Sequence, residues 1–124
     1  MSVKEFENIP LYTPAPALHG WLGLARRAGF VTPGVAPVVS FVKGRKKPKL
    51  VLIAAEAAET TKSKLWGLCY AHHVPYITLL SDGLLGDAIG MDTALYALAI
   101  SDARLAEKIK EACLPLKDSD IPQG

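Results

Sequence analysis

Three short and mainly apolar stretches stand out along the chain, at residues 49–54, 76–80 and 95–100. Each stretch is rich in Leu, Val, Ile or Ala and is bounded by polar or small residues. Such runs are typical of strands that are buried on both faces of a sheet. We therefore predict three core strands, with residues 49–54 at the centre of the sheet, and a shorter edge strand at residues 30–32.

Between these strands, apolar residues recur three or four positions apart, which is the spacing of helices with one buried face. The predicted helices span residues 17–28, 35–43, 59–72, 82–89 and 103–113. Because helices alternate with buried strands, the predicted fold class is α/β, with helices on both faces of a small sheet.

Several residues mark where these helices begin. Proline is tolerated only in the first turn of a helix, so Pro37 places the N-cap of the second helix near Gly34. Thr60 and Thr61 are alternative N-caps for the third helix, and Asp102 can cap the last one.

The chain has 124 residues, of which 50% are hydrophobic and 21% charged, which indicates one compact domain. Prolines at positions 10, 14 and 16 disfavour regular structure, so residues 1–16 are predicted to be an N-terminal arm, either packed on the domain or mobile. Residues 17–113 form the predicted domain, and residues 114–124, with two prolines, a loosely ordered C-terminal tail.

The sequence pattern shows neither a membrane-spanning segment nor a signal peptide. No apolar run reaches the roughly 18 residues of a membrane span. The first ten residues carry acidic side chains and no apolar stretch of signal-peptide length. We therefore expect a cytoplasmic protein without a membrane partner.

The charges are unevenly distributed along the chain. Net charge is only +2, but the segment from Arg26 to Lys64 holds nine basic and two acidic residues, a net +7. The densest part is a basic run between residues 43 and 49, and most acidic residues come later. This asymmetry favours an anionic partner. A solvated basic loop is the alternative interpretation.

No motif of enzymatic catalysis is present. The serines lack a G-x-S-x-G elbow, and no glycine-rich stretch matches a phosphate-binding or dinucleotide-binding loop. His72 and His73 are adjacent, so they point to different sides and do not form a metal pair. Cys69 and Cys113 fall on apolar helix faces and are predicted to be reduced core thiols. We expect no enzymatic activity, no metal and no cofactor.

Three stretches combine features that suit phosphate binding. Residues 32–36 and 56–62 each lead into a helix, whose free N–H groups can bind a phosphate. Residues 90–94 precede the last strand, and in a small α/β sandwich all three stretches can lie at one end of the sheet. A glycine that merely starts a helix and a solvated Lys62 are the alternative interpretations.

The order and spacing of several short motifs resemble those of one protein family. The motifs are LGLARRAG at residues 22–29, Gly34, KLVLIA at 49–54, TKxKL at 61–65, VPY at 74–76 and LGxAxG at 85–90. Together they resemble the ribosomal protein L7Ae/L30e family, and most closely its bacterial YlxQ-like branch. The resemblance implies a three-layer α/β/α sandwich around a mixed four-stranded sheet. It also implies binding of structured RNA, such as a kink-turn, through the three loop regions, without enzymatic activity or cofactor.

The chain departs from the family pattern at the residues that read RNA bases. L7Ae-type proteins carry an Asn-Glu pair after the loop glycine and a Lys three residues later, which contact sheared G·A pairs. Ala36, Pro37 and Ser40 occupy these places here, and Thr93 and Ala94 stand where an arginine is frequent. Because Ala36 and Pro37 offer no side-chain hydrogen bond to a base edge, contacts to the RNA backbone are expected to dominate.

The predicted partner is therefore structured RNA, with kink-turn and ribosomal RNA as the family's examples. The predicted RNA-binding residues are Gly34, Val35, Ala36, Ser40, Lys43, Arg45, Lys46, Lys47, Glu56, Thr60, Thr61, Lys62, Met91, Asp92 and Thr93. Two alternatives stay open: a protein–protein interaction module that kept the fold, and a substrate-recognition domain of a larger RNA-modifying enzyme.

Overall fold

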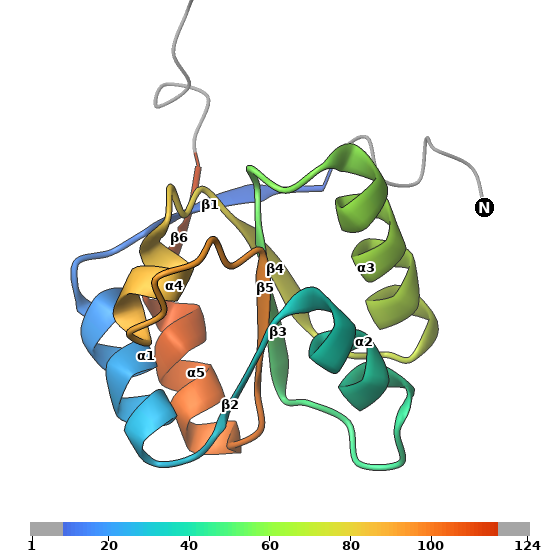
Figure 1. Cartoon of the computed structure of the whole chain (residues 1–124), viewed down its shortest axis with the longest axis horizontal. Coiled ribbons are helices and arrows are strands. Elements are labelled where there is room, and N and C mark those ends of the chain that lie inside the picture. Colours follow the sequence, from blue (N-terminus) through green and yellow to red (C-terminus); the bar gives the residue numbers. More distant parts are fainter. Residues whose placement is uncertain (1–8, 117–124) are drawn as a thin grey trace, which may run out of the picture.

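The computed structural model describes residues 9–116, which fold into an α/β/α sandwich (Figure 1). The strands are β1 (Leu11–Pro14), β2 (Val31–Pro33), β3 (Leu50–Ala54), β4 (Tyr76–Leu79), β5 (Ala97–Ile100) and β6 (Cys113–Pro115). The helices are α1 (Ala17–Arg27), α2 (Val35–Lys43), α3 (Glu59–Ala71), α4 (Leu84–Ala88) and α5 (Ala103–Glu111). None of the helices within residues 9–116 is long and apolar enough to cross a membrane.

The strands form one mixed sheet in the order β2-β5-β3-β4-β1-β6. Strand β3 lies parallel to β4 and antiparallel to β5, and β2 pairs antiparallel with β5 at one edge. The prediction that residues 49–54 form a central strand is confirmed. All five residues of β3 are fully buried, as a strand covered on both faces must be.

The sheet has six strands where four were expected, and the two additional ones come from the segments assigned to the arm and the tail. Strand β1 pairs parallel with β4, at Leu11 and Tyr12, and antiparallel with β6. The prolines do not prevent this, because Pro14 is the last residue of β1 and Pro115 the last of β6, where strands tolerate proline. Residues 1–8 and 117–124 of the arm and tail lie outside the described part.

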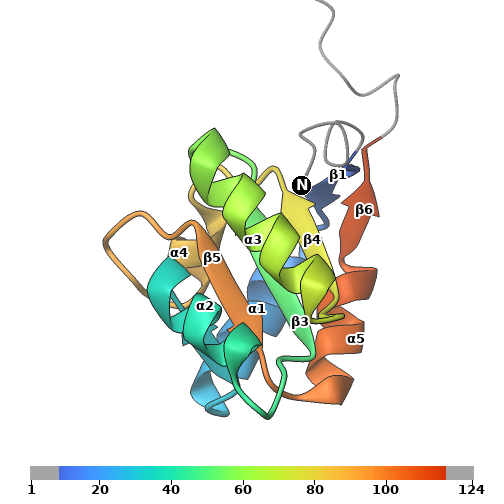
Figure 2. The ribbon, with the colours of Figure 1, turned by 90° about the vertical axis from the view of Figure 1, so that its right-hand side faces the viewer.

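Two apolar clusters hold the helices on opposite faces of the sheet (Figure 2). Helices α1, α4 and α5 cover one face, with Leu22, Leu85 and Ile109 in the first cluster. Helices α2 and α3 cover the other face, with Val38 and Leu65 in the second cluster. The three-layer prediction is therefore confirmed.

The predicted helix starts were right in two of three cases. Gly34 is the N-cap of α2, and the Asp102 carboxylate caps α5 by accepting a hydrogen bond from the Leu105 N–H at 2.9 Å. The threonine caps of α3 were wrong, because Ala58 occupies the N-cap position and Thr60 and Thr61 lie within the first turn. The N-cap lies two residues before Thr60 and three before Thr61, at Ala58, which has no side-chain hydrogen bond to the helix.

Removing β1 tests its place in the sheet. A chain that lacks residues 1–14 loses the β1 pairing with both neighbours, the burial of Tyr12 and the acceptor of the Leu80 N–H. We expect its free energy of unfolding to fall by about 2 kcal/mol or more, equivalent to roughly 10 °C in Tm. Thermal unfolding of this chain, compared with a chain that lacks only residues 1–8, measures the effect; equal midpoints would contradict a stabilising role of β1.

Candidate functional site

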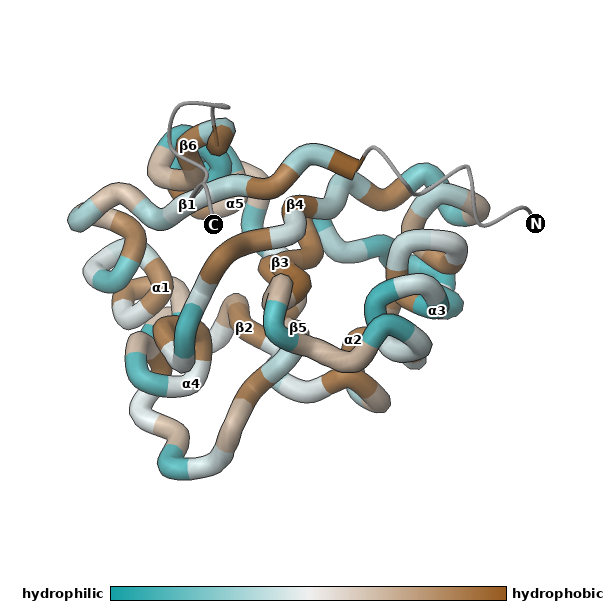
Figure 3. The backbone as a smooth tube through the Cα atoms, turned by 90° about the horizontal axis from the view of Figure 1, so that it is seen from above, coloured by the Kyte–Doolittle hydropathy of each residue, from teal (hydrophilic) through white to brown (hydrophobic). Residues whose placement is uncertain are grey.

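The three predicted loop stretches lie together at one end of the sheet, as expected. The Gly34 N–H donates to the Ala97 carbonyl at 2.9 Å, and the Ala54 N–H donates to the Tyr96 carbonyl at 2.9 Å. The segments that lead into α2 and α3 therefore lie on either side of the first residues of β5. We call this end, formed by residues 32–36, 55–62, 80–84 and 90–96, the loop end. It faces the viewer in Figure 3 and occupies the middle and upper part of Figure 1.

Gly34 adopts a backbone conformation that side chains disfavour. Its φ is 103° and its ψ is 146°, so a residue with a Cβ would be strained there. A Cβ would also lie 3.3 Å from Cδ of Pro37. Helix geometry leaves the N–H groups of Val35 and Ala36 without an intrahelical acceptor. Pro37, the third residue of the helix, has no N–H group. The α2 start can therefore give an anion two backbone donors.

The outer surface of α2 near this start is small and mostly apolar. Ala36, Pro37 and Ser40 are exposed, whereas Val35 is half-buried against the second apolar cluster. The three positions at which the family carries base-reading side chains thus do face solvent. Their side chains leave that surface without an amide, carboxylate or ammonium group.

Glu56 is tied to the neighbouring loop rather than free to bind a ligand. Both carboxylate oxygens accept from the Ser81 hydroxyl at 2.9 Å, and one accepts from the Gly83 N–H at 3.1 Å. Partial burial raises the pKa of the Glu56 carboxyl, but hydrogen bonds from the Gly83 and Glu56 N–H groups and from Ser81 outweigh it and leave the pKa below its ordinary value. Glu56 therefore joins the loop after β3 to the loop after β4.

Lys62 is also engaged within the protein. Its Nζ donates to the Ala55 carbonyl at 2.9 Å, pairs with Glu59 at 3.0 Å and lies 5.9 Å from the centre of the Trp66 ring. The Lys62 side chain is only 12% exposed. It stabilises the turn that leads into α3, which leaves the exposed Thr60 and the half-buried Thr61 as the polar groups of this helix start.

The third loop is held against α4. The Met91 N–H donates to the Gly86 carbonyl at 2.9 Å, and Met91 packs against the first apolar cluster. A Cβ on Gly86 would lie only 3.1 Å from the Thr93 carbonyl oxygen, so the close approach of the loop requires glycine. Of the predicted residues in this loop, Asp92 and Thr93 are exposed to solvent.

The predicted basic run does not extend the loop end. It joins the C-terminus of α2 to the start of β3, where the Lys49 N–H donates to the Ile100 carbonyl at 2.8 Å. Because β3 runs from this point toward the loop end, the run lies at the opposite end of the sheet, at the bottom of Figure 1. The predicted RNA-binding residues of the basic run and those of the loops therefore lie at opposite ends of the sheet and not on one surface. In the sequence, the basic run is close to the starts of both α2 and α3. In space it is far from them, because α2 separates it from one helix start and β3 separates it from the other.

Within the run, Lys43, Arg45 and Lys46 are exposed, whereas Lys47 turns inward. The Lys47 Nζ donates to the Val42 carbonyl at 2.7 Å and lies 3.0 Å from Nδ1 of His72. Lys47 therefore satisfies a carbonyl in the last turn of α2 and links it to the end of α3.

The loop end is acidic overall. Glu56, Glu59, Asp82 and Asp92 are located there, and the nearest cation, Lys62, already pairs with Glu59. A hollow of about 270 Å³ between the loops after β3 and β4 is lined by Glu56 and Asp82, which repel phosphate. A phosphate at this end is therefore best placed at the α2 start, away from that hollow.

Two exposed side chains at the loop end were missed from the sequence. Tyr96 and Leu80 are 41% and 40% exposed. Both were assigned to buried strands because they continue apolar runs, but β4 ends at Leu79 and β5 begins at Ala97. An aromatic ring next to the two helix starts can stack on a nucleic-acid base.

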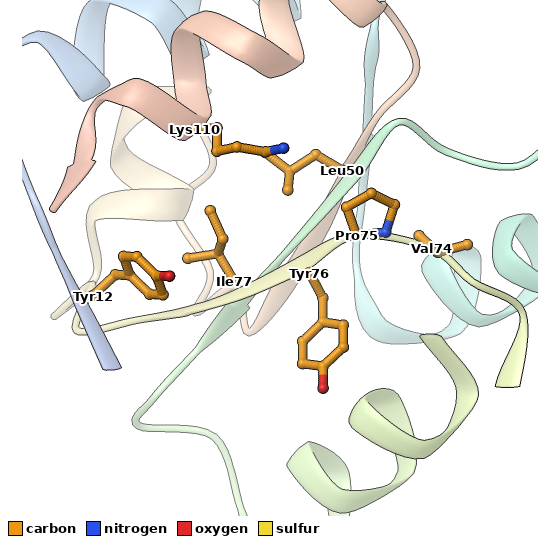
Figure 4. Close-up of a pocket in the computed structure, with 7 residues that line it drawn as sticks. All are labelled: Tyr12, Leu50, Val74, Pro75, Tyr76, Ile77 and Lys110. Atoms are coloured by element: carbon orange, nitrogen blue, oxygen red, sulfur yellow. The ribbon is translucent and has the colours of Figure 1, made fainter. Parts of the chain in front are cut away.

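A separate cavity of about 420 Å³ lies at the start of β4 (Figure 4). Tyr12, Ile77 and Lys110 line it on the side of the first apolar cluster, and Tyr76 points away from them toward α3. Burial, with smaller contributions from Cys69 and Tyr70, raises the pKa of the Tyr76 hydroxyl, so the hydroxyl stays protonated at neutral pH.

Residues 9–116 contain no group of His, Cys, Asp and Glu side chains that could bind a metal ion. Cys69 and Cys113 are buried free thiols, as predicted, and burial raises the pKa of each to about 12. The predicted helical position of Cys113 was wrong, because α5 ends at Glu111 and Cys113 is the first residue of β6. They are therefore protonated at neutral pH and poor nucleophiles.

The family model for the ribosomal protein L7Ae/L30e/S12e/Gadd45 family matches residues 16–110. The chain belongs to this family. Within the L7Ae family, it is 34% identical over 88 residues to the RNA-binding protein YlxQ of Bacillus subtilis, covering 71% of this chain and 86% of YlxQ. A YlxQ of Enterococcus faecium is 30% identical over 90 residues, covering 73% of this chain and 84% of that protein.

Solved structures agree with the L7Ae fold. A protein of unknown function from Bacillus halodurans superposes with a TM-score of 0.71 at 30% identity, over 79% of this chain and 96% of that one. The Giardia lamblia 15.5 kD RNA-binding protein gives a TM-score of 0.62 at 22% identity, over 77% and 86%. The resemblance to the L7Ae family and its YlxQ-like branch that the sequence predicted is confirmed.

Replacing Glu56 by Gln tests the link between the two loops. Because the folded-state pKa is lowered, the carboxylate contributes stability above its ordinary pKa of 4.5, and this stability is lost as pH falls through the folded value. We expect Glu56→Gln to cost about 1 kcal/mol at neutral pH, a modest value because the group is exposed. Urea unfolding across the acid range should show the difference shrinking below about pH 4.

The partner residue supplies the control. Ser81→Ala should cost less in the Glu56→Gln background than in the wild-type chain, because the two side chains bond to each other. Additive costs, or a Glu56→Gln effect independent of pH, would mean that this hydrogen bond does not stabilise the loops.

Proposed function

We propose that this protein is a non-catalytic RNA-binding protein that uses its loop end to bind structured RNA. The observation that carries the proposal is that two helix starts, at Gly34 and Ala58, lie at the same end of the sheet, with the segments that lead into them on either side of the first residues of β5. Membership of the L7Ae family and the names of the YlxQ relatives support RNA as the ligand.

The donors at the α2 start fit a phosphate of the RNA backbone. Val35 and Ala36 present free N–H groups at a helix N-terminus, where the helix dipole favours an anion. The glycine before them lets the RNA backbone approach closely. Thr60 adds an exposed hydroxyl at the α3 start. These groups bind phosphate and sugar and do not distinguish one base from another.

The side chains at the start of α2 limit how well this protein can distinguish one RNA base from another. Asn and Glu bind base edges through amide and carboxylate groups, and Ala36 and Pro37 have neither. We therefore infer that this protein recognises a kink-turn weakly, through the shape of its backbone. Ribosomal RNA and other folded RNAs with an accessible bend are the candidate ligands.

Restoring the family side chains tests this inference. The triple substitution Ala36→Asn, Pro37→Glu and Ser40→Lys changes three exposed positions and leaves the net charge unchanged. We expect it to bind a kink-turn RNA at least ten-fold more tightly than the wild-type chain, since one well-placed base contact contributes about 1–3 kcal/mol. Fluorescence anisotropy titration measures both affinities.

A straight RNA duplex of equal length is the matched control ligand, and its affinity should not change. A failure of the wild-type chain to bind any structured RNA at low salt would overturn the proposed function. If the wild-type chain binds structured RNA and the triple substitution does not increase its affinity, the loop end is not part of the RNA interface.

Tyr96 is the second test of the loop end. Base stacking on an aromatic ring contributes about 1–3 kcal/mol, so Tyr96→Ala should weaken binding of a kink-turn RNA about ten-fold. Tyr96→Phe keeps the ring and should bind as the wild type does. Equal affinities of both variants would show that the ring makes no base contact.

The exposed apolar groups of the loop end favour a second candidate function, a protein–protein interaction module. Ala36, Pro37 and Leu80 give this end an apolar surface that would suit another protein. A stoichiometric protein partner that survives nuclease treatment, together with no binding of structured RNA, would favour this function over the first.

A further inference from the structure

The end of the sheet opposite the loops gathers unpaired cations from three elements. Helix α1 ends there, the loop after α2 crosses it, and α5 begins there, as the Ser101 N–H bond to the Phe30 carbonyl at 3.0 Å and the Lys49 bond to Ile100 show (Figure 1). We call this surface the basic end. Its exposed cations include Arg26, Lys43, Arg45, Lys46, Lys49 and Arg104.

None of these six side chains forms an ion pair or a hydrogen bond among residues 9–116. Elsewhere in the described chain, Lys62, Lys108 and Lys110 each pair with a glutamate three residues away. The acidic side chain at the basic end is Asp102, and its carboxylate already caps α5. The basic end therefore lacks compensating charge of its own.

Helix stability explains the positions of only some of these six cations. Arg26 and Lys43 lie in the last turns of α1 and α2, where the helix dipole favours a cation. Arg45, Lys46 and Lys49 lie in a loop outside any helix. Arg104 lies in the first turn of α5, where the dipole disfavours a cation. Neither an ion pair nor a position in the last turn of a helix accounts for these four cations.

We propose that the basic end is a second RNA-binding surface, which binds the phosphate backbone of a duplex segment. This inference rests on the proposed RNA-binding function. The cations are spread over α1 and α5 on one face of the sheet and over the loop after α2 on the other. That breadth fits the two phosphate rows of a duplex better than a single small anion.

The two surfaces act independently of each other. Strand β3 separates them by five residues, roughly 16 Å. This distance exceeds the Debye length of about 8 Å at physiological ionic strength, so the acids of the loop end are largely screened from the basic end. One molecule can therefore contact a bent RNA element with its loops and a neighbouring duplex with its basic end.

A pair of charge-matched variants tests the proposal with a 20-base-pair RNA duplex that has no bulge. The test variant is Arg45→Gln, Lys46→Gln and Lys49→Gln, and the control variant is Lys64→Gln, Lys108→Gln and Lys110→Gln. Each loses three positive charges. We expect the test variant to bind the duplex at least ten-fold more weakly at low salt, and the slope of log affinity against log salt to fall by about three. The control variant should stay within about two-fold of the wild type.

The outcomes separate this proposal from the proposed function. Equal loss in both variants, or none in the test variant while the wild type binds RNA, would overturn the basic end as an RNA-binding surface and leave the loop end untouched. Absence of all RNA binding by the wild type would overturn the proposed function itself. Displacement of the duplex by polyglutamate at equal charge concentration would assign the basic end to an acidic protein instead of RNA. Unchanged Tm values of both variants exclude unfolding as the cause.

Discussion

The complete burial of β3 is the constraint on which the rest of the molecule depends. Leu50, Leu52 and Ala54 face the first apolar cluster, and Val51 and Ile53 face the second. A strand packed on both faces accommodates a polar side chain only where it finds a partner, as Thr78 of β4 does by accepting a hydrogen bond from Trp66 at 2.8 Å. Every polar group that could contact a ligand is therefore displaced to the two ends of the sheet or to the outer surfaces of the helices.

The elements with strong periodic patterns were predictable because burial alone determines them. The strands around residues 50–54, 76–79 and 97–100 and all five helices appear where the apolar spacing places them. Strands β1 and β6 were not predictable, because their sequences contain proline and bury few side chains. They form through backbone pairing with partners that are distant in sequence, which a local pattern does not reveal.

The position of the candidate site was predictable from the sequence. Which of its side chains are hydrogen-bonded within the protein was not. Pro37 correctly placed the α2 start at Gly34, and the three loops do meet at one end. Sequence pattern could not show that Glu56, Lys62 and Lys47 are engaged within the protein, because a long side chain can fold back to a carbonyl or a neighbouring loop that only the fold brings near. The exposure of Tyr96 was missed for a related reason. An apolar run in the sequence does not show at which residue the chain enters or leaves the sheet.

The separation of charge between the two ends follows from the direction of the helices. Helices α1, α2 and α3 begin at the loop end, and α1 and α2 finish at the basic end. Helix dipoles therefore favour acidic residues near the loops and basic residues opposite them, as Glu59, Arg26 and Lys43 illustrate. The same dipoles make the loop end attractive to phosphate, so acidic side chains and an RNA backbone compete for the same N–H groups. Acidic side chains at these helix starts therefore weaken the electrostatic attraction of the loop end for phosphate. In the proposed mode of binding, the basic end supplies the stronger electrostatic attraction to RNA.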